Sequence, residues 1–108
     1  MTTKELADLL RGAPCRIHLI GVAGSGMSGI AALLLALGHR VSGSDKVDTV
    51  EVKRLQSLGL DFHTLQRAAD VVDTQLVVYS SAIRQGNAAF DAARSLGKPM
   101  VKIGRAHV

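Results

Sequence analysis

The chain of 108 residues has few of the side chains that mark several large classes of protein. Cys15 is its single cysteine, and aromatic residues make up 3% of the chain, with no tryptophan. Disulfide-stapled secreted domains need paired cysteines, and platforms for single-stranded nucleic acid need stacked aromatic rings. Both classes are therefore disfavoured. We interpret Cys15 as a small buried side chain beside a strand and not as a nucleophile.

Long apolar runs and concentrated charge are also missing. The apolar run 30–37 is too short to span a bilayer. The net charge of +4 is spread along the chain, whereas a nucleic-acid backbone requires a continuous basic stripe. These features predict a cytoplasmic protein with neither nucleic acid nor membrane as a partner.

The four histidines show no spacing typical of metal ligands, and no Ser-His-Asp arrangement can be recognised. We therefore assign no metal site and no catalytic residue. His18 lies in the middle of an apolar segment and is expected to be a hydrogen-bonded core residue. The other three are expected at the surface or at strand edges: His39, His63 and His107.

Strand-like apolar segments alternate with helix-like segments along the whole chain. Strands are expected at 16–21, 40–42, 60–63, 75–79 and 99–103. Helices are expected at 2–11, 25–37, 49–58 and 88–96, with a weak helical turn at 65–69. This alternation predicts an α/β fold, a doubly wound five-stranded parallel sheet in the order 3-2-1-4-5 with helices on both faces. We expect one domain over 1–108, in which 1–14 form an N-terminal helix and lead-in.

A glycine-rich turn stands between the first strand and its helix. The segment Gly24-Ser25-Gly26-Met27-Ser28-Gly29 has G-x-G-x-x-G spacing, and Asp45 follows about one βαβ unit later. Such a turn binds a diphosphate through backbone amides at a helix N-terminus, with Ser25 or Ser28 adding a hydroxyl. The alternative is that these glycines only allow tight packing. Met27 occupies the lysine position of a P-loop, so the turn is not of that type.

Three segments are expected to meet at the carboxyl ends of the strands, where the winding of the sheet reverses. They are the glycine-rich turn at 21–29, the segment 42–45 at the end of the second strand with Ser44 and Asp45, and the segment 80–83 at the end of the fourth with Ser80 and Ser81. Asp45 could accept hydrogen bonds from sugar hydroxyls or cap the next helix. The two serines could contact a polar ligand or cap the next turn.

Three stretches of the chain resemble the amino-terminal domain of the Mur ligase family, in the branch that adds L-alanine to UDP-N-acetylmuramate. They read IHLIGVAGSGMSGIA at 17–31, GHRVSGSD at 38–45 and VVYSSAI at 77–83. The resemblance implies a Rossmann-like domain that binds the UDP part of UDP-N-acetylmuramate. It places Gly24, Ser25, Gly26 and Met27 against the diphosphate, and Asp45 with the Ser80-Ser81 loop beside the ribose and uracil.

The resemblance also implies a larger enzyme. In such ligases a central domain binds ATP and magnesium, the muramoyl carboxylate becomes an acyl phosphate, and the amine of L-alanine displaces the phosphate. We find neither that domain nor the C-terminal domain in these 108 residues, which we expect to bind the UDP moiety and to be inactive alone. The chain departs from the family pattern in three places: Ala23 for glycine, Leu65-Gln66 for Gly-His, and Asn87-Ala-Ala for Asn-Pro-Glu.

Three other functions stay open at this point. A related Mur ligase that attaches a recycled tripeptide shares the same kind of domain. An NAD-binding or NAD-sensing module shares the glycine spacing and the acidic residue after the second strand. A regulatory or scaffold domain with no ligand would need none of these polar residues. Binding of UDP-N-acetylmuramate or of NADH distinguishes these functions.

Overall fold

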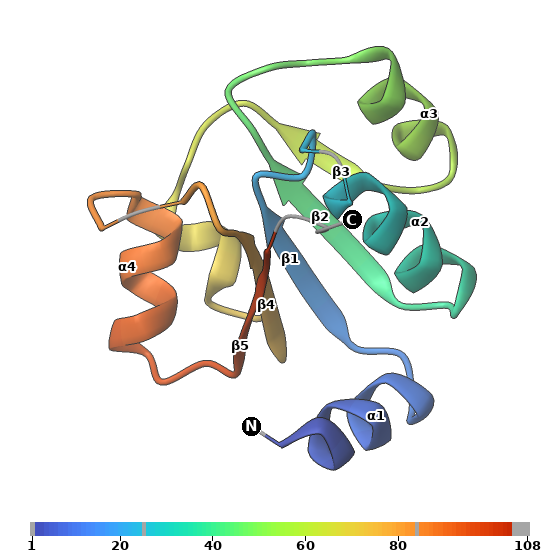
Figure 1. Cartoon of the computed structure of the whole chain (residues 1–108), viewed down its shortest axis with the longest axis vertical. Coiled ribbons are helices and arrows are strands. Elements are labelled where there is room, and N and C mark those ends of the chain that lie inside the picture. Colours follow the sequence, from blue (N-terminus) through green and yellow to red (C-terminus); the bar gives the residue numbers. More distant parts are fainter. Residues whose placement is uncertain (1, 25, 84, 105–108) are drawn as a thin grey trace.

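The computed structural model describes residues 2–24, 26–83 and 85–104 and shows a five-stranded parallel sheet flanked by helices on both sides (Figure 1). The strand order is β3-β2-β1-β4-β5, as predicted. The strands are β1 (Arg16–Ile20), β2 (Arg40–Ser44), β3 (Asp61–His63), β4 (Leu76–Ser80) and β5 (Met100–Ile103). The helices are α1 (Thr3–Arg11), α2 (Met27–Ala36), α3 (Val50–Ser57) and α4 (Ala88–Ser95), with a 3₁₀ helix η1 (Ala68–Val71).

The two faces of the sheet carry separate hydrophobic clusters, because successive strand residues point to opposite faces. Ile17 and Leu19 of β1 pack with residues of α2 and α3, including Leu34 and Leu55. Ile20 joins a smaller cluster with residues of η1, β4 and α4. Figure 1 shows α2 and α3 on one side of the sheet and α4 on the other. The doubly wound architecture predicted from the sequence is therefore confirmed.

Element boundaries match the predictions to within one residue except at three places, of which the first is the start of α2 at Met27, two residues after the predicted start. β2 continues to Ser44, two residues beyond the predicted end, because Gly43 and Ser44 pair in register with both β1 and β3. The helical turn predicted at 65–69 forms instead as η1, Ala68–Val71. In the last two cases contacts with distant segments decide the structure of a short, weakly patterned stretch.

One part of the sheet lacks a helical cover. The connection from β3 to β4 contains only the four-residue η1, so the side of β2 and β3 that faces away from α2 and α3 carries polar residues. Ser42 pairs in register with Asp61, and Ser44 pairs with His63. This polar face has a different chemical character from the apolar face beneath α2 and α3.

The prediction that His39 lies at the surface or at a strand edge is wrong. The residue is buried, with 5% of its surface exposed. Its Nδ1 accepts from the Cys15 amide at 3.1 Å, and its Nε2 donates to the Leu10 carbonyl at 2.8 Å. The imidazole thereby joins the end of α1 to the start of β1. Cys15 is half-buried against the core, where burial raises the pKa of its thiol. His63 is half-buried, and His107 lies outside the described residues.

We expect Gly43→Ala to destabilise the fold by about 1–3 kcal/mol, the usual cost of overpacking a filled site. A Cβ at Gly43 in the centre of β2 would lie 2.9 Å from the Cβ and Cγ1 of Val22, a contact that real Cβ atoms avoid. Urea unfolding measures the loss. Gly29→Ala is the control, because a Cβ there would contact nothing within 4 Å and favours helix by up to about 1 kcal/mol. Equal stability of the two variants would contradict this account.

Candidate functional site

The glycine-rich turn is fastened to the end of β2. The amides of Gly21 and Val22 both donate to the Ser44 carbonyl, at 2.8 and 3.1 Å. The turn then folds on itself, because the Gly24 amide donates to the Gly21 carbonyl at 3.1 Å. The Gly24 carbonyl accepts from the amides of Met27 and Ser28, which begins α2. The N-terminus of α2 is thus held at the carboxyl edge of the sheet.

Asp45 ties the same turn to the segment that follows β2. Its Oδ2 accepts from the Ala23 amide at 3.0 Å, and its Oδ1 accepts from the Val47 amide at 3.2 Å. The cap of α3 is Thr49, whose hydroxyl accepts from the Val52 amide, so the helix-cap alternative for Asp45 is wrong. The half-buried carboxylate therefore borders the glycine-rich turn, and each of its oxygens already accepts from a backbone amide.

Two glycines of the motif leave clear space in front of α2. Gly26 has φ +85° at the N-cap, and a Cβ at Gly26 or Gly29 would meet nothing within 4 Å. Close packing does not account for these two glycines, whereas at Gly21 and Gly24 a Cβ would lie 3.1 Å from the Cβ of Ser80 and 3.3 Å from the Gly21 carbonyl oxygen, as the packing alternative expects. Open surroundings at the N-cap of a helix suit an anionic group, which backbone N–H groups and the helix dipole favour.

Ser80 and Ser81 lie beside the turn but have different roles. A Cβ at Gly21 would lie 3.1 Å from the Cβ of Ser80, so the end of β4 touches the start of the turn. The Ser80 hydroxyl accepts from the Ala82 amide at 3.2 Å, which confirms the turn-cap alternative for this residue. Ser81 is exposed, and its amide donates to the Ile103 carbonyl at 3.0 Å.

Met27 and Ser28 begin α2. Met27 is 1% exposed, and its Cγ lies 3.8 Å from the position of a Cβ on Gly24, so its side chain packs against the turn from the core side. Only the backbone of Met27 can face a ligand at this edge. Ser28 is half-buried, and the predicted site residue Ser25 lies outside the described residues.

The sequence predicts that Ser44 contacts a ligand, but its side chain is buried, with 0% exposure. Its hydroxyl is hydrogen-bonded to other side chains. It donates to Gln66 Oε1 at 2.8 Å and therefore accepts from His18 Nε2 at 3.2 Å. His18 Nδ1 is left to accept from the Ser42 hydroxyl at 2.7 Å. This chain of hydrogen bonds fits a neutral imidazole, and burial lowers the pKa of His18 to about 4. Ser44 supports the site through its carbonyl and not through its hydroxyl.

A cluster of ionisable residues beside this chain was missed by the sequence analysis. Asp70 Oδ1 accepts from Arg67 at 2.8 Å and lies 3.0 Å from His63 Nε2. The rings of His63 and His18 stack with centroids 6.1 Å apart. The spacing of Arg67 and Asp70 is a local signal for their ion pair, but the approach of His63 depends on the fold.

Two further observations apply to residues 2–24, 26–83 and 85–104. Within these ranges no three His, Cys, Asp or Glu side chains are grouped so that they could hold a metal ion. None of the helices found there has the length and apolar character needed to cross a membrane.

Comparison with known proteins gives a consistent family assignment. The model of the "Mur ligase family, catalytic domain" matches residues 16–106. The UDP-N-acetylmuramate–L-alanine ligase of Stenotrophomonas maltophilia strain K279a is 48% identical over 94 residues, which are 87% of this chain and 20% of that protein. The chain thus spans about a fifth of this curated relative.

Two solved structures are similar in fold and sequence. The UDP-N-acetylmuramate-alanine ligase of Thermotoga maritima has a TM-score of 0.76 and 30% identity over 82% of this chain and 20% of its own. The second is the UDP-N-acetylmuramate:L-alanyl-gamma-D-glutamyl-meso-diaminopimelate ligase of Neisseria meningitides. It has a TM-score of 0.73 and 31% identity over 83% of this chain and 29% of its own. Because the family model covers most of a chain with this glycine-rich turn and strand order, the chain belongs to the Mur ligase family.

Proposed function

We propose that this chain is the domain that binds the UDP moiety of UDP-N-acetylmuramate in a ligase that joins L-alanine to that substrate. The observation that carries the proposal is the open space at Gly26, the N-cap of α2, in a turn that Asp45 holds through the Ala23 amide. The φ of +85° favours glycine at position 26, and its open surroundings leave room for a diphosphate at the helix N-terminus. The 48% identical relative bears the name of this ligase.

Each site residue has a defined part in this proposal. The diphosphate is seated beside Gly26 at the N-terminus of α2, where the amides of Gly24, Met27 and Ser28 already donate to carbonyls of the turn, and the exposed hydroxyl of Ser81 contacts the nucleoside. Each carboxylate oxygen of Asp45 accepts one backbone amide, from Ala23 or from Val47, and keeps a further lone pair. With these lone pairs Asp45 accepts hydrogen bonds from the ribose hydroxyls or the base. Ser44 and Ser80 act as supports, since their hydroxyls are bonded within the protein.

The proposal extends to a larger, cytoplasmic enzyme of which these residues are the substrate-binding part. ATP and magnesium belong to that whole enzyme, and the residues here do not fit them. Met27 stands where a P-loop has lysine, its side chain is buried, and no three His, Cys, Asp or Glu side chains are grouped among the described residues so that they could hold a metal ion. We propose that this chain binds and orients the UDP-sugar and that the catalytic step belongs to the rest of the ligase. The rest of the ligase is its proposed intramolecular partner.

A second candidate is the ligase that attaches a recycled tripeptide. The Neisseria structure bears the name of such an enzyme, and its identity and TM-score are close to those of the Thermotoga alanine ligase. The fold of this domain therefore does not separate the two. The 48% identity to the Stenotrophomonas ligase favours the alanine enzyme.

Calorimetric titration with UDP-N-acetylmuramate and, separately, with NADH tests the proposal. We expect heat of binding with the UDP-sugar and none with NADH. UDP alone should retain much of the affinity, because the proposed contacts are to the UDP moiety. UMP, which lacks the diphosphate, should bind more weakly. Binding of NADH in place of the UDP-sugar, or of UMP as tightly as UDP, would contradict the proposal.

A further inference from the structure

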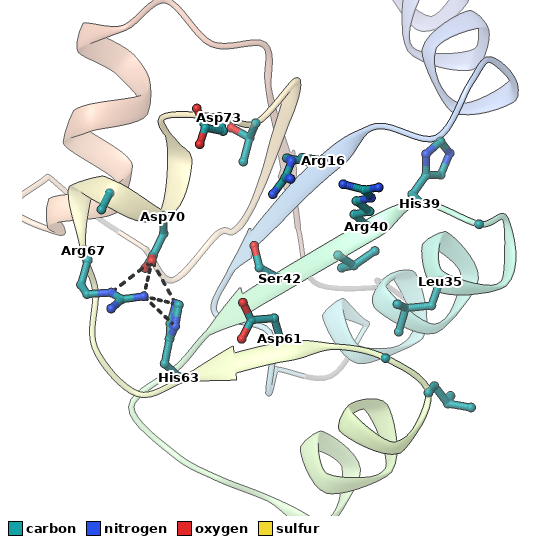
Figure 2. Close-up of a pocket in the computed structure, with 16 residues that line it drawn as sticks. Arg16, Leu35, His39, Arg40, Ser42, Asp61, His63, Arg67, Asp70 and Asp73 are labelled. Atoms are coloured by element: carbon teal, nitrogen blue, oxygen red, sulfur yellow. Dashed lines mark hydrogen bonds and ion pairs between the residues drawn. The ribbon is translucent and has the colours of Figure 1, made fainter.

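A groove of about 580 Å³ lies over the polar face of β2 and β3 (Figure 2). Its charges are mixed at both ends: Arg16 and Asp73 line one end, and Arg67 pairs with Asp70 at the other. The groove therefore favours no ligand of one charge. The part of the sheet that α4 covers carries a hollow of a different kind.

This hollow, of about 570 Å³, has charge of one sign only. It is formed by α4, by β4 and β5, and by the loop after β4, and its lining residues are Tyr79, Ile83, Gln85, Phe90, Arg94 and Lys102. None of these residues is acidic. Within the described part of the chain, neither Arg94 nor Lys102 forms an ion pair. Two cations thus border one hollow without a counter-ion.

An aromatic wall connects the two cations. The Cζ of Arg94 lies 5.8 Å from the centroid of the Phe90 ring, which is within the range of a cation–π contact. The rings of Phe90 and Tyr79 meet edge to face, with their centroids 5.0 Å apart. Tyr79 is in turn the register partner of Lys102 on the neighbouring strand. The four side chains therefore form a row in which the apolar surface lies between the positive charges.

The hollow adjoins the proposed UDP site but is separate from it. No residue of the glycine-rich turn lines the hollow, and neither serine of the Ser80-Ser81 loop does. Ile83 stands between the two places, because it lines the hollow and its Cδ1 would lie 3.6 Å from a Cβ at Gly21. Asp91, which precedes Arg94 on α4, lines an adjoining hollow, and its Oδ2 accepts from the Gly86 amide at 3.0 Å.

We propose that this hollow binds a small organic acid, that is, a carboxylate carried on an apolar body. The carboxylate accepts hydrogen bonds from Arg94 and Lys102, and the apolar body lies against Phe90, Tyr79 and Ile83. Guanidinium and ammonium groups are strong donors to a carboxylate, whose charge also offsets the repulsion between the two cations. A hollow of this volume with an aromatic wall and a few polar groups is typical of small-molecule sites. The inference does not depend on the proposed function.

The test is an NMR titration of the ¹⁵N-labelled chain with 3-phenylpropanoate. We expect amide shifts at residues 79, 90, 94 and 102. The corresponding alcohol, which lacks the charge, and acetate, which lacks the ring, should each bind at least about threefold more weakly. Arg94→Gln and Lys102→Gln should each weaken binding of 3-phenylpropanoate about threefold or more. Lys4→Gln is the matched control, because Lys4 is exposed on α1, which packs against the hydrophobic cluster beneath α2.

Several results would overturn the proposal. They are shifts that lie outside the hollow, binding of the alcohol or of acetate as tight as that of the acid, and an unchanged affinity in both hollow variants. An equal loss in Lys4→Gln would also overturn it, because the attraction would then come from the net charge of the chain.

Titration of the same variants with UDP-N-acetylmuramate keeps the two sites apart. We expect both hollow variants to retain their affinity for the UDP-sugar. A loss in both would mean that the hollow is part of the UDP site and would overturn the proposal. Failure of the parent chain to bind the UDP-sugar, with the acid still bound in the hollow, would contradict the proposed function alone.

Discussion

Gly26→Val should reduce the affinity for UDP-N-acetylmuramate by about a hundredfold or more, which corresponds to about 2.7 kcal/mol. Gly26 is the N-cap of α2, and apart from its two chain neighbours a Cβ there would meet nothing within 4 Å. A branched side chain there would occupy the volume that the diphosphate needs and would hold the phosphate away from the backbone amides. Calorimetric titration measures the loss directly.

Strain at Gly26 has to be separated from obstruction of the ligand. The φ of +85° is unfavourable for any L-residue, so valine should also lower the stability of α2. Gly38→Val is the matched control, because Gly38 follows the other end of α2 with φ +91° and equally open surroundings. Both variants should melt below the parent chain, but only Gly26→Val should lose the ligand. Equal affinities of the two variants for UDP-N-acetylmuramate would mean that the diphosphate does not bind at this turn.

The fold was predictable because local and global signals agree along most of the chain. β1 and β4 are short apolar runs that lie buried between two layers, and such runs have few other stable arrangements. Thr49 and Asn87 cap α3 and α4, and Gly38, Gly59 and Gly97 follow the ends of α2, α3 and α4 with positive φ. Right-handed crossovers then leave the order 3-2-1-4-5 as the simplest topology.

The site was only partly predictable, because its hydrogen bonds cross long sequence distances. The position of Asp45 beside the glycine-rich turn follows from topology, and its bond to Ala23 agrees with that. The burial of Ser44 could not be foreseen, because it depends on contacts with His18 and Gln66, which lie 26 and 22 residues away. His39 is a similar case, because its two backbone partners belong to α1 and the start of β1.

His18 should make the stability of the fold depend on pH by about 3 kcal/mol. Its folded-state pKa is lowered from 6.5 to about 4 by burial first, with smaller lowering from His63 and Arg67, while Asp70 and Asp61 act in the opposite direction. Between about pH 6.5 and pH 4, His18 is protonated in the unfolded chain but stays neutral in the folded chain. The stability that the neutral His18 contributes is therefore present in full above about pH 6.5 and is lost as the pH drops toward 4. Below pH 4 this group causes no further change.

Comparison with His18→Gln isolates this contribution. Glutamine retains hydrogen-bonding groups near Ser42 and Ser44 but cannot take up a proton, while the carboxylates and the other histidines titrate in both proteins. The variant should be less stable at pH 7, because the ordered chain from Ser42 to Gln66 is disturbed. Urea unfolding at pH 7 and pH 4.5 should show that its stability falls by about 2–3 kcal/mol less than that of the parent chain. Parallel losses in the two proteins would mean that His18 is protonated in the folded state and that the hydrogen-bond order beside the glycine-rich turn is different.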